Sequence, residues 1–189
     1  MGKGTLVKVK ATTAAEVCAC FDLKPEARPL LSDGMGPNEF VEALLANKQY
    51  IAAIDFMAHA LPAREAVWWG CLCLQHASGG MLSPEDKAAC KAAVQWVIQP
   101  TEENRGAAQA PAQDAGTLSA AGQLATAASQ TDMNFTLPNA PAPAGPSAAA
   151  KSVAGAVRML SATAEPVKII ETQRLFVELA IGVAEARFA

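Results

Sequence analysis

The stretch Pro62–Ala77, PAREAVWWGCLCLQHA, decides the fold of this chain. Pro62 suits the first position of a helix, where its missing N–H leaves no hydrogen bond unmade. From Val67 to Leu74 every residue is apolar or small, and a helix that is apolar on all sides has to be enclosed by other elements. The stretch therefore predicts a central, buried helix around which the remaining elements pack.

Two tryptophans and a glycine in the middle of this helix predict how closely it is enclosed. Trp68 and Trp69 supply large apolar areas for burial, and each indole N–H requires a hydrogen-bond partner. Gly70 costs a helix interior about 1 kcal/mol relative to Ala, so its presence indicates close approach by a neighbouring helix. We expect at least one of the two tryptophans to be fully buried, so that its replacement by Ala costs about 3–5 kcal/mol.

The composition favours helices that pack through small side chains. The chain has 189 residues, enough for one or two domains, of which 51% are hydrophobic, 17% charged and only 5% aromatic. The net charge of −3 gives no support for nucleic-acid binding, and no apolar run reaches the roughly 20 residues of a membrane span. The N-terminus lacks the apolar core of a secretory signal. We therefore expect a cytoplasmic protein with no nucleic-acid partner and no membrane span.

Capping residues, prolines and helical spacing predict an all-α fold of about eight helices in a single domain, 1–189. Short connections between consecutive helices indicate antiparallel neighbours in HEAT-like helical hairpins, although no repeat consensus is present. We expect the amphipathic last helix to dock on the bundle formed by the first ones. The expected helices are Ala14–Phe21, Pro37–Ala46, Lys48–Ala60, Pro62–Ala77, Pro84–Ile98, Glu102–Ala115, Leu118–Ser129, Ser147–Ala162 and Glu165–Arg187.

Three segments are expected to depart from a regular helix. The N-terminal arm, 1–12, contains a weak alternation at Thr5–Lys10 that predicts a short strand or an ordered arm. Pro111 is expected to kink or shorten the helix in which it lies. The stretch 134–146, NFTLPNAPAPAGP, has four prolines and a glycine, which predict an extended surface loop before the last two helices.

The sequence contains five cysteines, an odd number in a chain large enough to fold without disulfides. Two C-x-C pairs occur, and because residues i and i+2 of a helix point about 200° apart, neither pair can hold one metal ion from one helix. Small buried thiols in a reducing compartment are the simplest interpretation. The alternative is a thiol-dependent protein, a metal site or a redox switch, in which Cys90 faces one of the central cysteines across two antiparallel helices. Its candidate residues are Cys71, Cys73, His76 and Cys90.

Motifs of common enzyme classes are missing from the sequence: it has no P-loop, no nucleophile elbow, no H-E-x-x-H and no dinucleotide fingerprint. A Cys73–His76 nucleophile pair has suitable spacing, but the apolar run around it lacks the exposed, electropositive setting that a reactive thiolate needs. The sequence therefore predicts a protein without enzymatic activity and without a cofactor.

Asp55, Arg64 and Glu65 are the candidate partner-binding residues. Arg64 and Glu65 start the central helix, and Asp55 lies on the helix before it. In the simpler interpretation these side chains are solvated, with an Arg64–Asp55 ion pair worth under about 1 kcal/mol. In the functional interpretation they form a polar patch at one end of the bundle that binds a partner protein.

The segment Asn38–Ala77, above all A-L-P-A-R-E-A-V-W-W-G-C-L-C-L, resembles an uncharacterised bacterial family of similar length. The likeness extends through Ser83–Asn104 and to the V-A-G-A-V helix at Val153, so it covers most of the chain. Members of that family are helical proteins without an assigned activity that tend to accompany type VI secretion genes. The resemblance implies no functional residues. It implies a non-enzymatic adaptor or chaperone-like accessory protein with a protein partner from the secretion system.

Overall fold

The computed structural model describes residues 5–79, 81–131 and 147–187 of the chain. Over these ranges the chain has no strand and eight α-helices of seven residues or more, so the all-α prediction is confirmed. None of the helices in these ranges is long and apolar enough to span a bilayer. The predicted loop at 134–146 lies outside the described residues. The α-helices are α1 (Ala14–Cys18), α2 (Pro37–Ala46), α3 (Tyr50–Ala60), α4 (Ala63–Ser78), α5 (Pro84–Ile98), α6 (Glu102–Ala107), α7 (Gln109–Ala115), α8 (Ala120–Ser129), α9 (Ala148–Ala162) and α10 (Ile169–Ala184).

The helix starts follow the capping residues that the sequence displays. At α2, the Glu39 side chain accepts a hydrogen bond from Gly36 N at 3.0 Å. At α5, Ser83 Oγ accepts a hydrogen bond from Asp86 N at 3.0 Å. Both side chains satisfy backbone N–H groups that a helix start leaves without a carbonyl partner, so these boundaries are determined locally and were predicted correctly.

Some helix bounds differ from the prediction for reasons of backbone geometry. α3 begins at Tyr50 rather than Lys48, because Lys48 has a φ of 57°, which a right-handed helix cannot contain. The helix predicted at Glu102–Ala115 is divided into α6 and α7 just before Pro111, whose ring has no N–H to donate to the carbonyl four residues back. α1 ends three residues earlier than predicted, and α10 begins four residues later and ends three residues earlier than predicted.

Over its described residues the N-terminal arm is an irregular segment that lies against the end of α10. Lys8 N donates a hydrogen bond to Ala184 O at 2.9 Å, and the Leu6 side chain is buried in the core. Of the two predicted forms, the ordered arm is therefore correct and the short strand is wrong. The arm joins the first part of the chain to the end of the last helix.

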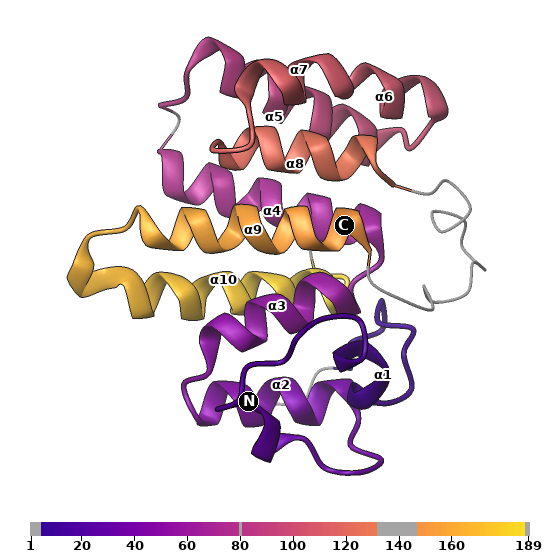
Figure 1. The fold of residues 1–189 in the computed structure, drawn as a ribbon, viewed down its shortest axis with the longest axis vertical. Coiled ribbons are helices and arrows are strands. Elements are labelled where there is room, and N and C mark those ends of the chain that lie inside the picture. Colours follow the sequence, from indigo (N-terminus) through magenta and orange to yellow (C-terminus); the bar gives the residue numbers. More distant parts are fainter. Residues whose placement is uncertain (1–4, 80, 132–146, 188–189) are drawn as a thin grey trace.

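The two C-terminal helices are inserted between α3 and α4 (Figure 1). α5, α6, α7 and α8 lie beyond α4 at one end of the molecule, and α1 and α2 lie beyond α3 at the other. α9 packs against α8, α4 and α3, while α10 packs against both α3 and α4. The predicted docking of the last helix on the first ones is confirmed, but the prediction that α3 and α4 are side-by-side neighbours is wrong.

The connection between α3 and α4 explains why they separate. Leu61 and Pro62 both have extended backbone angles, with ψ values of 143° and 150°. Two extended residues carry the chain away from the axis of α3 before α4 begins, so this short connection does not make a hairpin. The next pair in the chain, α4 and α5, does pack together.

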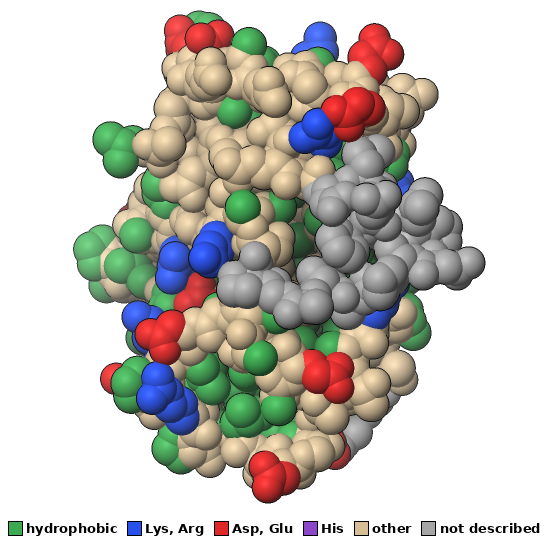
Figure 2. Space-filling model, turned by 45° about the vertical axis from the view of Figure 1, so that its right-hand side comes forward, with side chains coloured by type: hydrophobic (Ala, Val, Ile, Leu, Met, Phe, Trp, Pro, Cys, Tyr) green, Lys and Arg blue, Asp and Glu red, His purple; other side chains and the backbone are tan. Residues whose placement is uncertain are grey.

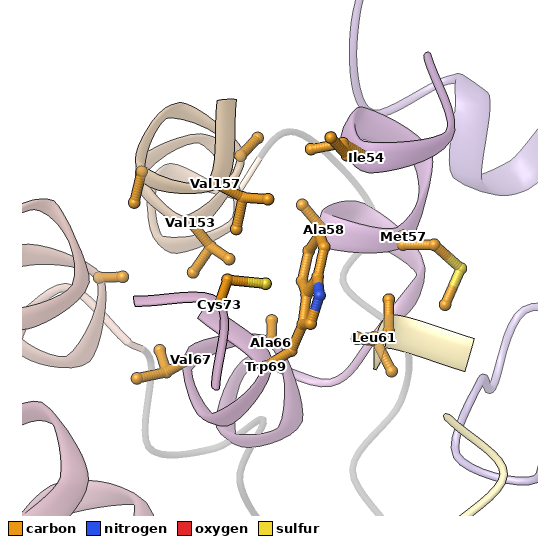
Figure 3. Close-up of a cluster of buried hydrophobic side chains, with 14 of the residues drawn as sticks. Ile54, Met57, Ala58, Leu61, Ala66, Val67, Trp69, Cys73, Val153 and Val157 are labelled. Atoms are coloured by element: carbon orange, nitrogen blue, oxygen red, sulfur yellow. The ribbon is translucent and has the colours of Figure 1, made fainter. Parts of the chain in front are cut away.

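The central position of α4 is confirmed by the burial of its tryptophan. Trp69 is fully buried, and its Nε1 donates a hydrogen bond to Phe176 O of α10 at 2.8 Å. Trp68, its neighbour, is only partly buried. Figure 3 shows the Trp69 ring beside Ala58 of α3 and Val157 of α9, which places it where the inserted helices meet the N-terminal part of the chain.

Gly70 marks the contact between α4 and α8. A Cβ atom at Gly70 would lie 2.2 Å from a methyl carbon of Leu124, far closer than two carbon atoms can approach. The close approach of a neighbouring helix that Gly70 predicts is therefore confirmed, and α8 is that neighbour.

Candidate functional site

The two cysteines of α4 face different neighbours. Cys71 meets Cys90 of α5, and the two thiols share a hydrogen bond. Cys73 is fully buried and points away from that pair, where Figure 3 shows it close to Val153 and Val157 of α9. The divergence expected of a C-x-C pair on one helix is therefore observed. Cys90 faces Cys71, as the antiparallel packing of α4 and α5 predicts.

The hydrogen bond between the two thiols separates their acidities. It lowers the pKa of Cys90 to about 7, because the Cys71 S–H stabilises a thiolate on Cys90, although burial acts in the opposite sense. The same hydrogen bond, followed by burial, raises the pKa of Cys71 well above its ordinary value. Burial also raises the pKa of Cys73, and burial together with Cys20 raises the pKa of Cys18 to about 12. Of the two facing thiols, Cys90 is therefore the one that loses its proton more readily.

His76 does not join the thiol pair. It is exposed near the end of α4, and its ring lies edge-on to that of Phe176, with the ring centroids 6.2 Å apart. Within 5–79, 81–131 and 147–187, no three His, Cys, Asp or Glu residues gather into a metal-ligand set. Of the four candidate residues, the structure brings together Cys71 and Cys90 and leaves Cys73 and His76 apart from them.

Asp55 of α3 pairs with a residue of α9. Arg158 Nη1 lies 3.2 Å from Asp55 Oδ1, with the Asp55 side chain 9% exposed and that of Arg158 44% exposed. Burial raises the pKa of Asp55, and the positive charges of Arg158 and Lys24 oppose that shift. The carboxyl group of Asp55 thus connects α3 to one of the inserted helices.

Arg64 and Glu65 each have a partner within the chain. Arg64 Nε donates a hydrogen bond to Val97 O at 2.7 Å, in the last turn of α5, where carbonyl groups lack helical N–H partners. Glu65 Oε1 lies 3.5 Å from Lys8 Nζ of the N-terminal arm. The predicted Arg64–Asp55 ion pair is therefore wrong, because helices that are close in the sequence are separated here by α9 and α10. Asp55, Arg64 and Glu65 thus each contact a different part of the chain.

A half-buried histidine that was not among the candidate residues lies one turn after Asp55 on α3. The His59 ring stacks on that of Phe21, with the ring centroids 5.0 Å apart, and its Nδ1 is buried without a hydrogen-bond partner in the part of the chain that the structure describes. Burial, helped by the positive charges of Lys151 and Arg158, lowers the pKa of His59 to about 4. The spacing of Asp55 and His59 on one helical face was visible in the sequence, but their cationic neighbours on α9 were not.

Large apolar side chains stand exposed at one edge of the molecule, and sequence analysis did not find them. They belong to the α4–α5, α7–α8 and α9–α10 connections and the start of α10, all at the left of Figure 1. Hydrophobic side chains also protrude at the left margin of Figure 2. Helical periodicity could not reveal this surface, because most of its residues lie outside the α-helices. We name it the apolar edge; it comprises Met81 (88% exposed), Leu118 (92%), Val167 (88%) and Ile170 (62%).

The fold and these contacts define an all-α protein built around a buried central helix, with a pair of facing thiols and an exposed apolar edge. The chain belongs to a family of unknown function, DUF6931, whose family model matches residues 40–184. The match runs from α2 to the end of α10 and leaves out the arm and α1. The prediction that the chain belongs to an uncharacterised family is thereby confirmed. No curated protein and no solved structure matches the chain.

Proposed function

We propose that the protein is a non-enzymatic adaptor or chaperone-like accessory of a bacterial type VI secretion system, acting in the cytoplasm through a protein partner. The observation that carries this proposal is the apolar edge, where four large apolar side chains are exposed, three in connections and one at the start of α10. Single exposed apolar side chains are ordinary on a protein surface, whereas several at one edge are typical of an interaction site. The secretion context comes from the family resemblance of the sequence.

A partner that covers the apolar edge gains a substantial binding free energy. Full burial of one Leu or Met side chain contributes about 1.5–3 kcal/mol. Leu118 and Met81 are 92% and 88% exposed, so nearly all of that contribution is available to a partner. Replacing both residues by Lys removes it and adds two charges that binding would have to desolvate. We therefore expect the affinity to fall about a hundredfold or more.

The test is capture of partners from the native host with the tagged full-length protein, followed by mass spectrometry and a binding titration with the purified partner. We expect the wild type to retain a secretion-system component and the variant Met81→Lys/Leu118→Lys to lose it. Ile98→Lys is the matched control, because Ile98 is 63% exposed but lies at the opposite end of α5 from Met81, and it should bind normally. Equal binding by the edge variant, or a captured partner unrelated to secretion, would contradict the proposal.

One observation favours the thiol-dependent alternative, the hydrogen bond between Cys71 and Cys90. A metal form of this alternative requires ligands beyond these two thiols, and Cys73 and His76 lie apart from them. A redox form requires only two thiols that meet. The geometry therefore supports the redox form of the alternative over the metal form.

A further inference from the structure

Cys71 and Cys90 occupy matching positions on two antiparallel helices. α4 ends at Ser78 and α5 begins at Pro84, and each cysteine lies about two helical turns from the connection between them. Because α4 and α5 pack together, the thiols consequently face each other, close enough for each to shift the pKa of the other. Both cysteines are free in the structure.

The two thiols differ in solvent exposure and in pKa, as an oxidation in two steps requires. Cys90 is only partly buried, so a small oxidant can reach it, whereas Cys71 is 5% exposed. Cys90 also has the lowered pKa, so it supplies the thiolate that is the nucleophilic form of cysteine. Cys71 remains a protected thiol directly beside it.

From this arrangement we infer that Cys90 and Cys71 form a peroxide-reactive dithiol, in which Cys90 is oxidised first and Cys71 then closes a disulfide between α4 and α5. The Cys90 thiolate attacks one oxygen of hydrogen peroxide, the O–O bond breaks, and the products are a Cys90 sulfenic acid and hydroxide. The Cys71 sulfur then attacks the Cys90 sulfur and displaces its hydroxyl group, while the Cys71 proton leaves with it as water. Two thiols lose two electrons, and one peroxide is reduced to two waters.

Two of the other three cysteines, Cys73 and Cys18, are poorly placed to compete for this reaction. Cys73 is fully buried among the apolar side chains of α9, and burial raises its pKa. Cys18 has a pKa raised to about 12, which leaves almost none of its thiolate at neutral pH. The contact between Cys71 and Cys90 should therefore make oxidation selective for one pair among the five cysteines.

The experiment treats the full-length reduced protein with hydrogen peroxide and then alkylates the remaining thiols under denaturing conditions. We expect three alkylated cysteines rather than five, a mass lower by two hydrogens before alkylation, and a cross-linked peptide that joins Cys71 to Cys90. Reduction should restore all five thiols. Five free thiols after treatment, or a cross-link between other cysteines, would overturn the inference.

Variants separate the two steps of the reaction. Cys71→Ser should form no cross-link and should accumulate a sulfenic acid at Cys90 that dimedone traps, whereas Cys73→Ser, the matched control on the same helix, should form the cross-link as the wild type does. Equal dimedone labelling of the wild type and Cys71→Ser would count against Cys71 as the resolving thiol. If Cys71→Ser does not fold, pulse alkylation of the native wild type decides the order, because Cys90 should react at least about tenfold faster than Cys71, and equal rates would overturn the order.

This inference deepens the thiol-dependent alternative and does not rest on the adaptor function. A protein that forms the cross-link but binds no partner would refute only the adaptor proposal. A protein that binds its partner through the apolar edge but keeps five free thiols under peroxide would refute only the dithiol.

Discussion

Replacement of Trp69 by Ala removes the largest fully buried side chain of α4, and its effect measures how strongly the inserted helices depend on that helix. Truncation of a buried aromatic residue to Ala costs about 3–5 kcal/mol, through lost apolar burial and the cavity left behind. The Nε1–H hydrogen bond to Phe176 O adds about 1 kcal/mol at most, because that carbonyl lies inside α10 and keeps its helical N–H partner. We therefore expect a loss of about 4–5 kcal/mol, a large part of the stability of a typical domain.

Two further substitutions keep this prediction measurable if Trp69→Ala does not fold. Trp69→Phe retains most of the buried ring and loses the hydrogen bond, so we expect a loss of about 1–2 kcal/mol. Trp68→Ala is the matched control, since Trp68 has the same chemistry one residue away but is only partly buried. Its cost should be less than half that of Trp69→Ala.

Urea unfolding followed by far-UV circular dichroism gives the free energy of unfolding of each variant. We expect the wild type to be the most stable. Trp69→Phe and Trp68→Ala should be less stable by similar amounts, and Trp69→Ala should be well below all three. If Trp68→Ala proves as damaging as Trp69→Ala, the assignment of Trp69 to the centre of the core is wrong.

Three further predictions concern single residues. Gly70→Ala should destabilise the protein by about 1–2 kcal/mol, because the added Cβ meets a buried methyl group of Leu124. Gly106→Ala is the control: the space at its Cβ in α6 is open, so it should stabilise the protein by up to about 1 kcal/mol. Equal shifts of the two variants in thermal unfolding would contradict this prediction. In the folded chain the pKa of His59 is lowered to about 4 from an ordinary 6.5. Between these two pH values the His59 side chain is protonated in the unfolded chain but not in the folded one, so stability is lost as the pH falls from 6.5 to about 4. Between those two pH values, His59→Gln should lose less stability than the wild type as the pH falls. If the urea midpoints of the two proteins change equally with pH, the assignment is refuted. Ser119→Ala should cost about 1 kcal/mol in urea unfolding, because Ser119 Oγ caps the start of α8.

The features that could be predicted are those encoded within a few residues. Ser83 followed by proline defines the start of α5 through a hydrogen bond to a backbone N–H three residues on, so the neighbouring sequence is sufficient. Glycine destabilises the interior of a helix, so Gly70 indicates that a neighbouring element approaches closely there. The sequence does not show that Leu124 is that neighbour.

The features that were missed depend on which helices meet. The Asp55–Arg64 pair was predicted from closeness along the chain, yet Asp55 pairs with Arg158, 103 residues away, because α9 occupies the space beside α3. For the same reason the sequence could show that Cys71 and Cys73 diverge, but could not show which of the two Cys90 faces. Leu118 was counted as the start of a helix, whereas it lies in the preceding connection and is exposed.

The insertion of α9 and α10 also determines when the protein can fold during its synthesis. The indole of Trp69 finds its acceptor at Phe176, 107 residues later, so the facing sides of α3 and α4 stay uncovered while the ribosome makes the intervening chain. Uncovered apolar faces of this kind are sites of aggregation and of chaperone binding on nascent chains. We therefore expect the N-terminal half to remain sensitive to proteases on the ribosome until α10 has left the exit tunnel and packs against α3 and α4.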